Sequence, residues 1–504
     1  MNADRSSQRR ASTDSGAGAT AAGSQTSGRR VDLLKVLPSL KWLVSQRWFQ
    51  FAVVFPNLLL FLLFLLAGAF GSPVGNRNII VVFVWILWWF LLISVMVPFA
   101  SRIWCTVCPF PFFGEWAQRR ALVDVRAVDP KQRRELDAEP GVLVGRNRYF
   151  GLNRRWPKQL SSIWLQNLGF LALCTFSALL LTRPIVSVLV LGSLILLATV
   201  MHLIYRHRAF CSYVCPVSGF LSLYAMTSMM EVRSADTDVC AQCGDKGCLA
   251  GNESGWGCSW GVYPSKLDRN NYCGLCMECV KTCPHDNMAL NLRPFGSDTR
   301  LKGYDEAWKA FIMLTLALAY SVIFQGPWGS FKDWANVTES GEIGGFLLYT
   351  FVLWAGALVV IPGIYALAVW MGRRLAGPHE ASAKQVFLGF VYPLVPLGLL
   401  VWVAFSLPLL LVNGSYILMV ISDPFGWGWD LFGTAQVDWT PLIPQWVPYL
   451  QVPLLLFGLA YSLKAGWRQA TNLFQKEGQA LRAFAPVAVV LTATVLCFFK
   501  LYTG

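Results

Sequence analysis

Nine long apolar runs constrain the fold of this 504-residue chain more than any other feature. Hydrophobic residues make up 55% of the chain and charged residues only 14%, a balance typical of membrane proteins. A helix needs about 20 apolar residues to cross the hydrocarbon core of a bilayer. We therefore expect nine spans, near residues 50–70, 79–100, 160–181, 185–205, 307–325, 346–371, 385–411, 447–465 and 484–503.

The charges of the loops predict the orientation of these spans. Residues 101–159 hold 12 Lys and Arg against 6 Asp and Glu, whereas residues 412–446 hold three Asp and no Lys or Arg. Basic loops stay in the cytoplasm, so the N-terminus and residues 231–300 are expected inside and the C-terminus in the periplasm. The expected location is the bacterial inner membrane. The net charge of +14 is then explained by cytoplasmic loops and membrane lipid, and we expect no nucleic acid as partner.

A dense cysteine run lies between the fourth and fifth predicted spans. Its second half reads C-x-x-C-x-x-C-x-x-x-C-P, which is the spacing of bacterial iron–sulfur proteins. The alternative is a four-cysteine zinc site, because C-x-x-C pairs also suit zinc. The eight cysteines are Cys240, Cys243, Cys248, Cys258, Cys273, Cys276, Cys279 and Cys283.

The spacing also predicts which cysteines share a cluster. In two-cluster ferredoxins the fourth cysteine of such a run binds the other cluster, so the two ligand sets cross. One predicted [4Fe–4S] set is Cys240, Cys243, Cys248 and Cys283, and the other is Cys258, Cys273, Cys276 and Cys279. Cys258 is followed by Ser259 instead of proline, which leaves the type and potential of the cluster in that motif open. Thiolate clusters need a reducing compartment, which agrees with the cytoplasmic placement of residues 231–300.

Two further cysteine pairs follow the second and fourth predicted spans. Each pair comes after a basic and aromatic stretch and is followed by proline and then glycine, a pattern that indicates a duplicated helical hairpin. The pairs are Cys105 with Cys108, before Pro109, and Cys211 with Cys215, before Pro216. Both are expected at the cytoplasmic membrane interface. Three roles stay open for their thiols: a third metal centre, reversible disulfides, or shaping of the turns.

The spans themselves contain few groups for other chemistry. No Asp or Glu lies in the middle of a predicted span, which argues against ion translocation. His202 is the one histidine inside a span, and a membrane haem normally needs two, so no haem is expected. We interpret His202 as a packed histidine, with proton acceptance as the alternative.

The cysteine motifs resemble the membrane polyferredoxins of the NosR and NapH type and, more distantly, CcoG. The similarity covers roughly residues 50–300 and rests on the two juxtamembrane pairs followed by the run from Cys240 to Cys283. It implies membrane iron–sulfur electron transfer linked to quinol oxidation. The first juxtamembrane pair is one residue shorter than the family's usual spacing. A flavin domain, as in NosR, does not fit the short polar N-terminal region, so no flavin is expected.

Together these features predict a polytopic α-helical membrane protein with a small ferredoxin-like two-cluster α+β insert. Its expected role is to relay electrons between the quinone pool and a partner redox enzyme, as the electron-transfer subunit of a quinol-linked oxidoreductase. The alternatives are a factor for maturation of a metalloenzyme and a transporter with a redox sensor. The predicted domains are a disordered basic tail (1–48), a four-span core (49–230), the two-cluster domain (231–300) and a five-span membrane domain (301–504).

Overall fold

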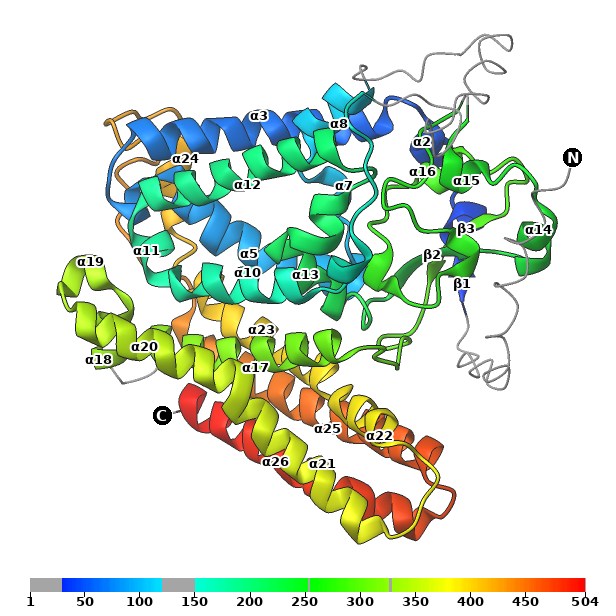
Figure 1. Ribbon diagram of the computed structural model, residues 1–504. Helices are drawn as coiled ribbons and strands as arrows, with labels where there is room; N and C mark the ends of the chain where they lie inside the picture. Colours follow the sequence, from blue (N-terminus) through cyan, green and yellow to red (C-terminus); the bar gives the residue numbers. More distant parts are fainter. Residues whose placement is uncertain (1–29, 120–149, 253, 326–328, 504) are drawn as a thin grey trace, which may run out of the picture.

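The chain is built mainly from long apolar helices (Figure 1). The computed structural model describes residues 30–119, 150–252, 254–325 and 329–503. Within these ranges, eight helical stretches are long and apolar enough to cross a membrane, which fits a polytopic membrane protein. They are Phe49–Phe70 (α3), Ile79–Ala100 (α4 to α6), Pro184–Ile204 (α12), Tyr304–Phe324 (α17), Ile343–Ala376 (α20 and α21), Ala383–Leu411 (α22 and α23), Pro444–Leu473 (ending in α25) and Glu477–Thr503 (α26).

The run predicted as a span at 160–181 is interrupted. It forms two shorter helices, α10 (Trp164–Thr175) and α11 (Ser177–Thr182). Phe176 lies between them with φ −96° and ψ 17°, and the Thr175 hydroxyl donates a hydrogen bond to the Leu171 carbonyl (2.9 Å). A threonine bonded in this way, four residues back, favours a bend in the helix. The break explains why the described residues give eight continuous spans where the sequence predicts nine.

A small antiparallel sheet lies beyond one end of the long helices, with the strand order β1–β3–β2 (Figure 1). Its strands are β1 (Val31–Asp32), β2 (Met230–Ser234) and β3 (Met288–Leu292), with Asp32 opposite Asn291 and Val232 opposite Leu290. The two longer strands therefore enclose the whole cysteine run in the sequence. The sheet holds the first and last residues of this segment side by side.

The N-terminal segment differs from the predicted disordered tail. Strand β1 is followed by α1 (Leu33–Val36) and α2 (Pro38–Ser45), and Leu34 and Val44 are buried in one cluster with Val232 and Leu290. Leu34 and Val44 thus complete a hydrophobic layer over the sheet. Residues 1–29 of the predicted tail lie outside the described residues.

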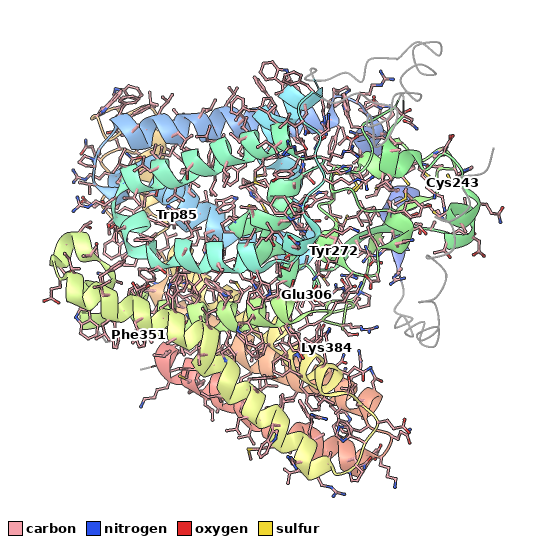
Figure 2. The ribbon with its side chains drawn as sticks, in the orientation of Figure 1. Trp85, Cys243, Tyr272, Glu306, Phe351 and Lys384 are labelled. Carbon is pink, nitrogen blue, oxygen red and sulfur yellow. The ribbon has the colours of Figure 1, made fainter. Side chains whose placement is uncertain are left out.

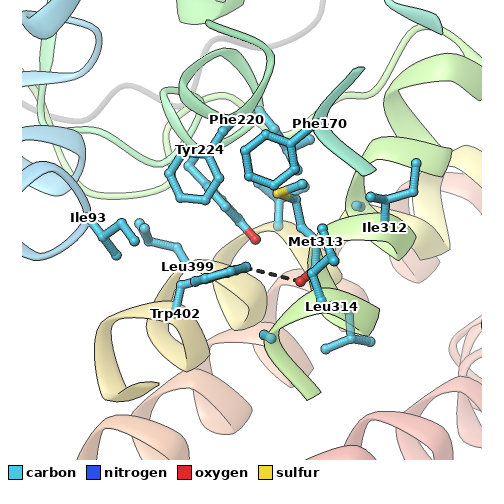
Figure 3. Close-up of a cluster of buried hydrophobic side chains, with 14 of the residues drawn as sticks. Ile93, Phe170, Phe220, Tyr224, Ile312, Met313, Leu314, Leu399 and Trp402 are labelled. Atoms are coloured by element: carbon cyan, nitrogen blue, oxygen red, sulfur yellow. Dashed lines mark hydrogen bonds between the residues drawn. The ribbon is translucent and has the colours of Figure 1, made fainter. Parts of the chain in front are cut away.

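The N-terminal and C-terminal membrane helices share one core (Figure 3). Trp402 of α23 (Leu394–Leu411) donates its indole N–H to the Met313 carbonyl of α17 at 3.1 Å. Its ring also meets Phe220 edge-on, with ring centroids 5.8 Å apart, and Trp89 at 6.0 Å. A fully buried tryptophan with its N–H satisfied contributes a large apolar contact area. The packing around Trp402 thus joins the C-terminal spans to the cysteine-bearing half.

Candidate functional site

The first predicted cysteine set gathers at the outer part of the small domain. Figure 2 shows Cys243 on the side of this domain that faces away from the long helices. Asn287 joins two members of the set that are far apart in sequence. Its backbone N–H donates to the Cys283 sulfur (3.2 Å) and its side-chain amide donates to the Cys240 sulfur (3.3 Å). Burial and the nearby thiols of Cys283, Cys240 and Cys243 together raise the pKa of Cys248 to about 11, so these side chains lie near one another.

The second predicted set surrounds one small cavity. Cys258, Cys273, Cys276 and Cys279 all line it. Between these cysteines, Leu275 and Met277 adopt left-handed backbone conformations, with φ of 55° and 59°. Such conformations are costly for residues other than glycine and persist where the surroundings impose them. The loop therefore turns tightly enough to aim its cysteines at one enclosed point.

The structure brings members of each predicted set near one another, and the described residues contain no site for a single metal ion. Among the described residues, no three Cys, His, Asp or Glu side chains come together in a way that could hold one metal ion. A zinc ion holds its four sulfurs at about 2.3 Å from one point. A [4Fe–4S] cluster binds each thiolate to a different iron, so its ligands are spread around a four-iron body. The zinc alternative and the cluster therefore differ in how closely the four sulfurs must approach one another.

The two juxtamembrane cysteine pairs meet at the ends of the long helices. Cys105 lies in α7 (Trp104–Val107), and Cys215 caps α13 (Pro216–Tyr224), where its sulfur accepts from the Ser218 N–H (3.4 Å). Burial raises the pKa of Cys211 well above its usual value, with further contributions from Cys215, Cys108 and Cys105. The structure therefore brings the two halves of the repeat to one junction, which we call the junction site: Cys105, Cys108, Cys211 and Cys215.

Buried cations surround the junction site. Arg102 is 2% exposed, donates to the Cys105 sulfur (3.9 Å) and to the Ser218 hydroxyl, and lies 4.3 Å from the ring centre of Trp260. Its Nε has no hydrogen-bond partner, and none of its partners among the described residues is a carboxylate. A buried charge without a counter-ion is costly. The junction site is thus suited to an anionic group, and a cluster held by four thiolates is one.

A second arginine at the junction is neutralised. Arg208 donates through Nε and Nη2 to the two carboxylate oxygens of Glu115 in α8 (Phe112–Arg119), at 2.5 and 3.0 Å, and through Nη1 to the Cys105 carbonyl (2.6 Å). Although burial raises the pKa of the Glu115 carboxyl, the charges of Arg208 and Arg119 lower it to about 2. The pair joins the flank of the first cysteine motif to the flank of the second.

Direct contacts place the three cysteine sets next to one another. The Thr106 hydroxyl donates to the Gly274 carbonyl (2.7 Å), and the Arg208 N–H donates to the Ser259 carbonyl (2.8 Å), so the junction site lies against the second set. The Cys258 N–H donates to the Cys248 carbonyl (3.0 Å), which joins the second set to the first. The three cysteine sets therefore follow one another in the order first set, second set and junction site, from the outer domain to the membrane helices.

Several residues at the site could not be predicted from the spacing of the cysteines. Asn287 lies outside the motif, and Arg102, Glu115 and Arg208 read as ordinary basic or acidic residues of a membrane loop. The matching flanks of the repeat contain the last three, which is the one pattern that could have singled them out. His202 is buried as expected, with Nδ1 2.7 Å from the Ala198 carbonyl, and its Nε2 has no partner among the described residues.

Comparison with known protein families matches the two segments that contain the junction cysteines. A family described as a 4Fe–4S binding domain matches residues 81–127 and 188–227. These two segments contain the two halves of the repeat, with Cys105 and Cys108 in one and Cys211 and Cys215 in the other. No curated protein and no solved structure matches the chain. The match supports an iron–sulfur protein, and the long apolar helices fit a multi-pass membrane protein.

Proposed function

We propose that this chain relays electrons between the quinone pool and a partner redox enzyme through iron–sulfur clusters. One observation carries the proposal: three neighbouring four-cysteine sets run from the outer domain to the membrane helices. Cys240, Cys243, Cys248 and Cys283 would hold one [4Fe–4S] cluster, and Cys258, Cys273, Cys276 and Cys279 a second. Residues 231–300, with strand β1, would form a ferredoxin-like domain. The junction site would hold a third centre.

The chain's own groups supply what such centres need from a protein. A bound cluster supplies one-electron transfer, while burial and hydrogen bonds to sulfur set its potential. Asn287 donates to two sulfurs of the first set, and Ser218 donates to Cys215. Arg102 holds a positive charge against Cys105. Each of these groups favours the more negative, reduced state of a centre held by the neighbouring cysteines.

An apolar cavity beside the junction supports quinone as the membrane-side reactant. The cavity has a volume of about 250 Å³ and is lined by aromatic residues, including Trp85 and Trp88 of the second span and Trp104 of α7. Trp104 directly precedes Cys105 and stacks edge-on with Trp88 at 4.8 Å. The Trp88 indole N–H has no hydrogen-bond partner among the described residues. The Ser177 hydroxyl, which also lines the cavity, has no partner among the described residues either. Apolar walls with a few free donors suit a quinone, whose flat apolar ring carries carbonyl acceptors.

The burial of the junction thiols favours electron relay over a role in metalloenzyme maturation. Cys105, Cys211 and Cys215 are each less than 9% exposed, and Cys108 is half-buried. Thiols that exchange with a partner protein need to be accessible to it. A buried set of four thiols is instead suited to hold a resident centre.

Anaerobic purification with iron and sulfide analysis tests the cluster assignment. Three four-iron clusters give about twelve iron and about twelve acid-labile sulfides per chain, and two give about eight of each. Stoichiometric zinc without sulfide would contradict the assignment. Reduction of the purified protein by a short-chain quinol tests the relay, with Trp88→Phe as the variant and Trp467→Phe, which lies outside the cavity, as the control. Trp88→Phe should slow cluster reduction by quinol while dithionite still reduces both variants fully.

A further inference from the structure

A lysine is fully buried in the membrane part of the chain. Lys309 is 0% exposed and lies in the second turn of α17 (Tyr304–Phe324). A charged side chain inside the bilayer is costly and normally faces a partner, a polar cavity or a functional group. Lys309 therefore needs a favourable partner to retain its charge at this depth.

The contacts that the chain provides are weak for an ammonium group. Its Nζ donates to the Gln166 carbonyl at 3.5 Å and lies 4.6 Å from the ring centre of Phe170. A desolvated cation–π contact recovers less free energy than burying an isolated charge costs. No carboxylate among the described residues forms an ion pair with Lys309, and its hydrogen bond within this part of the chain goes to a carbonyl.

The geometry directs the ammonium group toward the junction site. A Cβ added to Gly219 would lie 3.0 Å from Nζ, so the glycine leaves room for the ammonium group against the first turn of α13, directly after Cys215. Gln166, whose carbonyl accepts from Lys309, donates through its side chain to the Cys211 carbonyl (3.0 Å). The thiols of Cys174 and Cys215 lie within electrostatic reach of the Lys309 charge. Lys309 thus contacts the same turns that present the cysteines of the second repeat.

We infer that Lys309 is the buried counter-ion of the junction centre and raises its reduction potential. The inference rests on the proposed third centre. One-electron reduction adds one negative charge to such a centre, and a fixed cation in a low-dielectric site stabilises the reduced state more than the oxidised one. Arg102 lies on the side of the second set, at Cys105 and Trp260, and Lys309 lies on the side of α10 and α17. The two cations therefore approach the junction site from different elements.

The test is an EPR-monitored redox titration of the full-length protein, purified anaerobically and reduced stepwise with dithionite. Lys309→Met removes the charge with little change in volume, Lys309→Arg keeps it, and Lys500→Met is the control at the far end of α26. Lys309→Met should shift the junction centre to a lower midpoint potential and leave the centres of the other two sets unchanged. Lys309→Arg and Lys500→Met should keep the parent potentials. Loss of junction iron in Lys309→Met but not in Lys309→Arg would also support the inference.

Two outcomes would overturn it. Unchanged potentials of all centres in Lys309→Met would show that the charge does not act on the junction, and equal loss of junction iron in the Met and Arg variants would show a steric role. Failure of the proposed third centre itself gives a different result. In that case the parent protein holds about eight iron and shows no signal that depends on Cys105.

Discussion

Arg208 and Glu115 form a buried two-point ion pair that joins the two halves of the cysteine repeat, with Nε–Oε1 at 2.5 Å and Nη2–Oε2 at 3.0 Å. The side chains are 2% and 12% exposed. The pair lies where the backbone of Cys105 meets the second repeat, because Arg208 also donates to the Cys105 carbonyl. It is a structural support of the junction site rather than an exposed surface pair.

Glu115→Ala should destabilise the protein by about 3–5 kcal/mol, because it leaves the buried Arg208 charge unpaired. Thermal unfolding in detergent measures the loss, and Arg119→Ala, which removes the looser partner at 3.8 Å, should cost much less. Equal effects of the two substitutions would contradict the dominant role of the Arg208 pair.

The same pair predicts how stability depends on pH. The folded-state pKa of Glu115 lies at about 2, below the ordinary value of 4.5, so its contribution is fully present above about pH 4.5 and is lost as the pH falls toward 2. The difference in stability between Glu115→Gln and the parent should therefore be the same at pH 6 and pH 8. A difference that changes between these values would show that the carboxyl titrates near neutrality.

Cys276→Ser should remove the centre of the second set and spare much of the first, because Cys276 is central to the loop that lines that cavity. Cys105→Ser should leave both centres between Cys240 and Cys283 intact and remove only the junction signal. Low-temperature EPR of the reduced variants distinguishes the sets. Loss of both outer signals in a folded Cys105 variant would show that the ligands are grouped differently.

Asn287→Ala should lower the midpoint potential of the first-set centre, because it removes the amide donor to the Cys240 sulfur. The backbone donor to Cys283 remains, so the shift should be partial. EPR-monitored titration checks this, with Asn291→Ala on strand β3 as a control that contacts no cysteine sulfur. A shift of the junction centre instead would contradict the assignment of Asn287 to the first set.

The composition of the loop 412–446 predicts that it lies on the periplasmic side of the membrane. Trp427 and Trp429 pack on Phe425, with ring centroids at 4.4 and 5.4 Å, and both remain more than 40% exposed. Tryptophan prefers the membrane interface, and the loop lacks basic residues. A cysteine placed at Asp430 should react with an impermeant reagent from the periplasm. Labelling only after cell lysis would overturn the predicted orientation.

The sequence predicts most of the membrane helices, because long apolar runs are a local feature, while the crossed cysteine grouping stays a prediction. It misses features that depend on which side of an element faces the core. Lys309, six residues after Gly303, reads as the usual basic flank of a span, yet it points inward and is fully buried. The two-residue strand Val31–Asp32 is too short to show an alternation of apolar and polar residues. It is recognised as a strand only by its pairing with β3. The break at Phe176 follows from a side-chain hydrogen bond that composition does not reveal.

The pairing of β1 with β3 has a consequence for how often the chain crosses the bilayer. Two strands that share hydrogen bonds lie on one face of the membrane, so the chain between Asp32 and Met288 must make an even number of crossings. The long helices α3, α4 to α6 and α12 supply three. Parity then requires a fourth, and α10 with α11 is the remaining apolar stretch. We therefore expect the interrupted pair to make the fourth crossing.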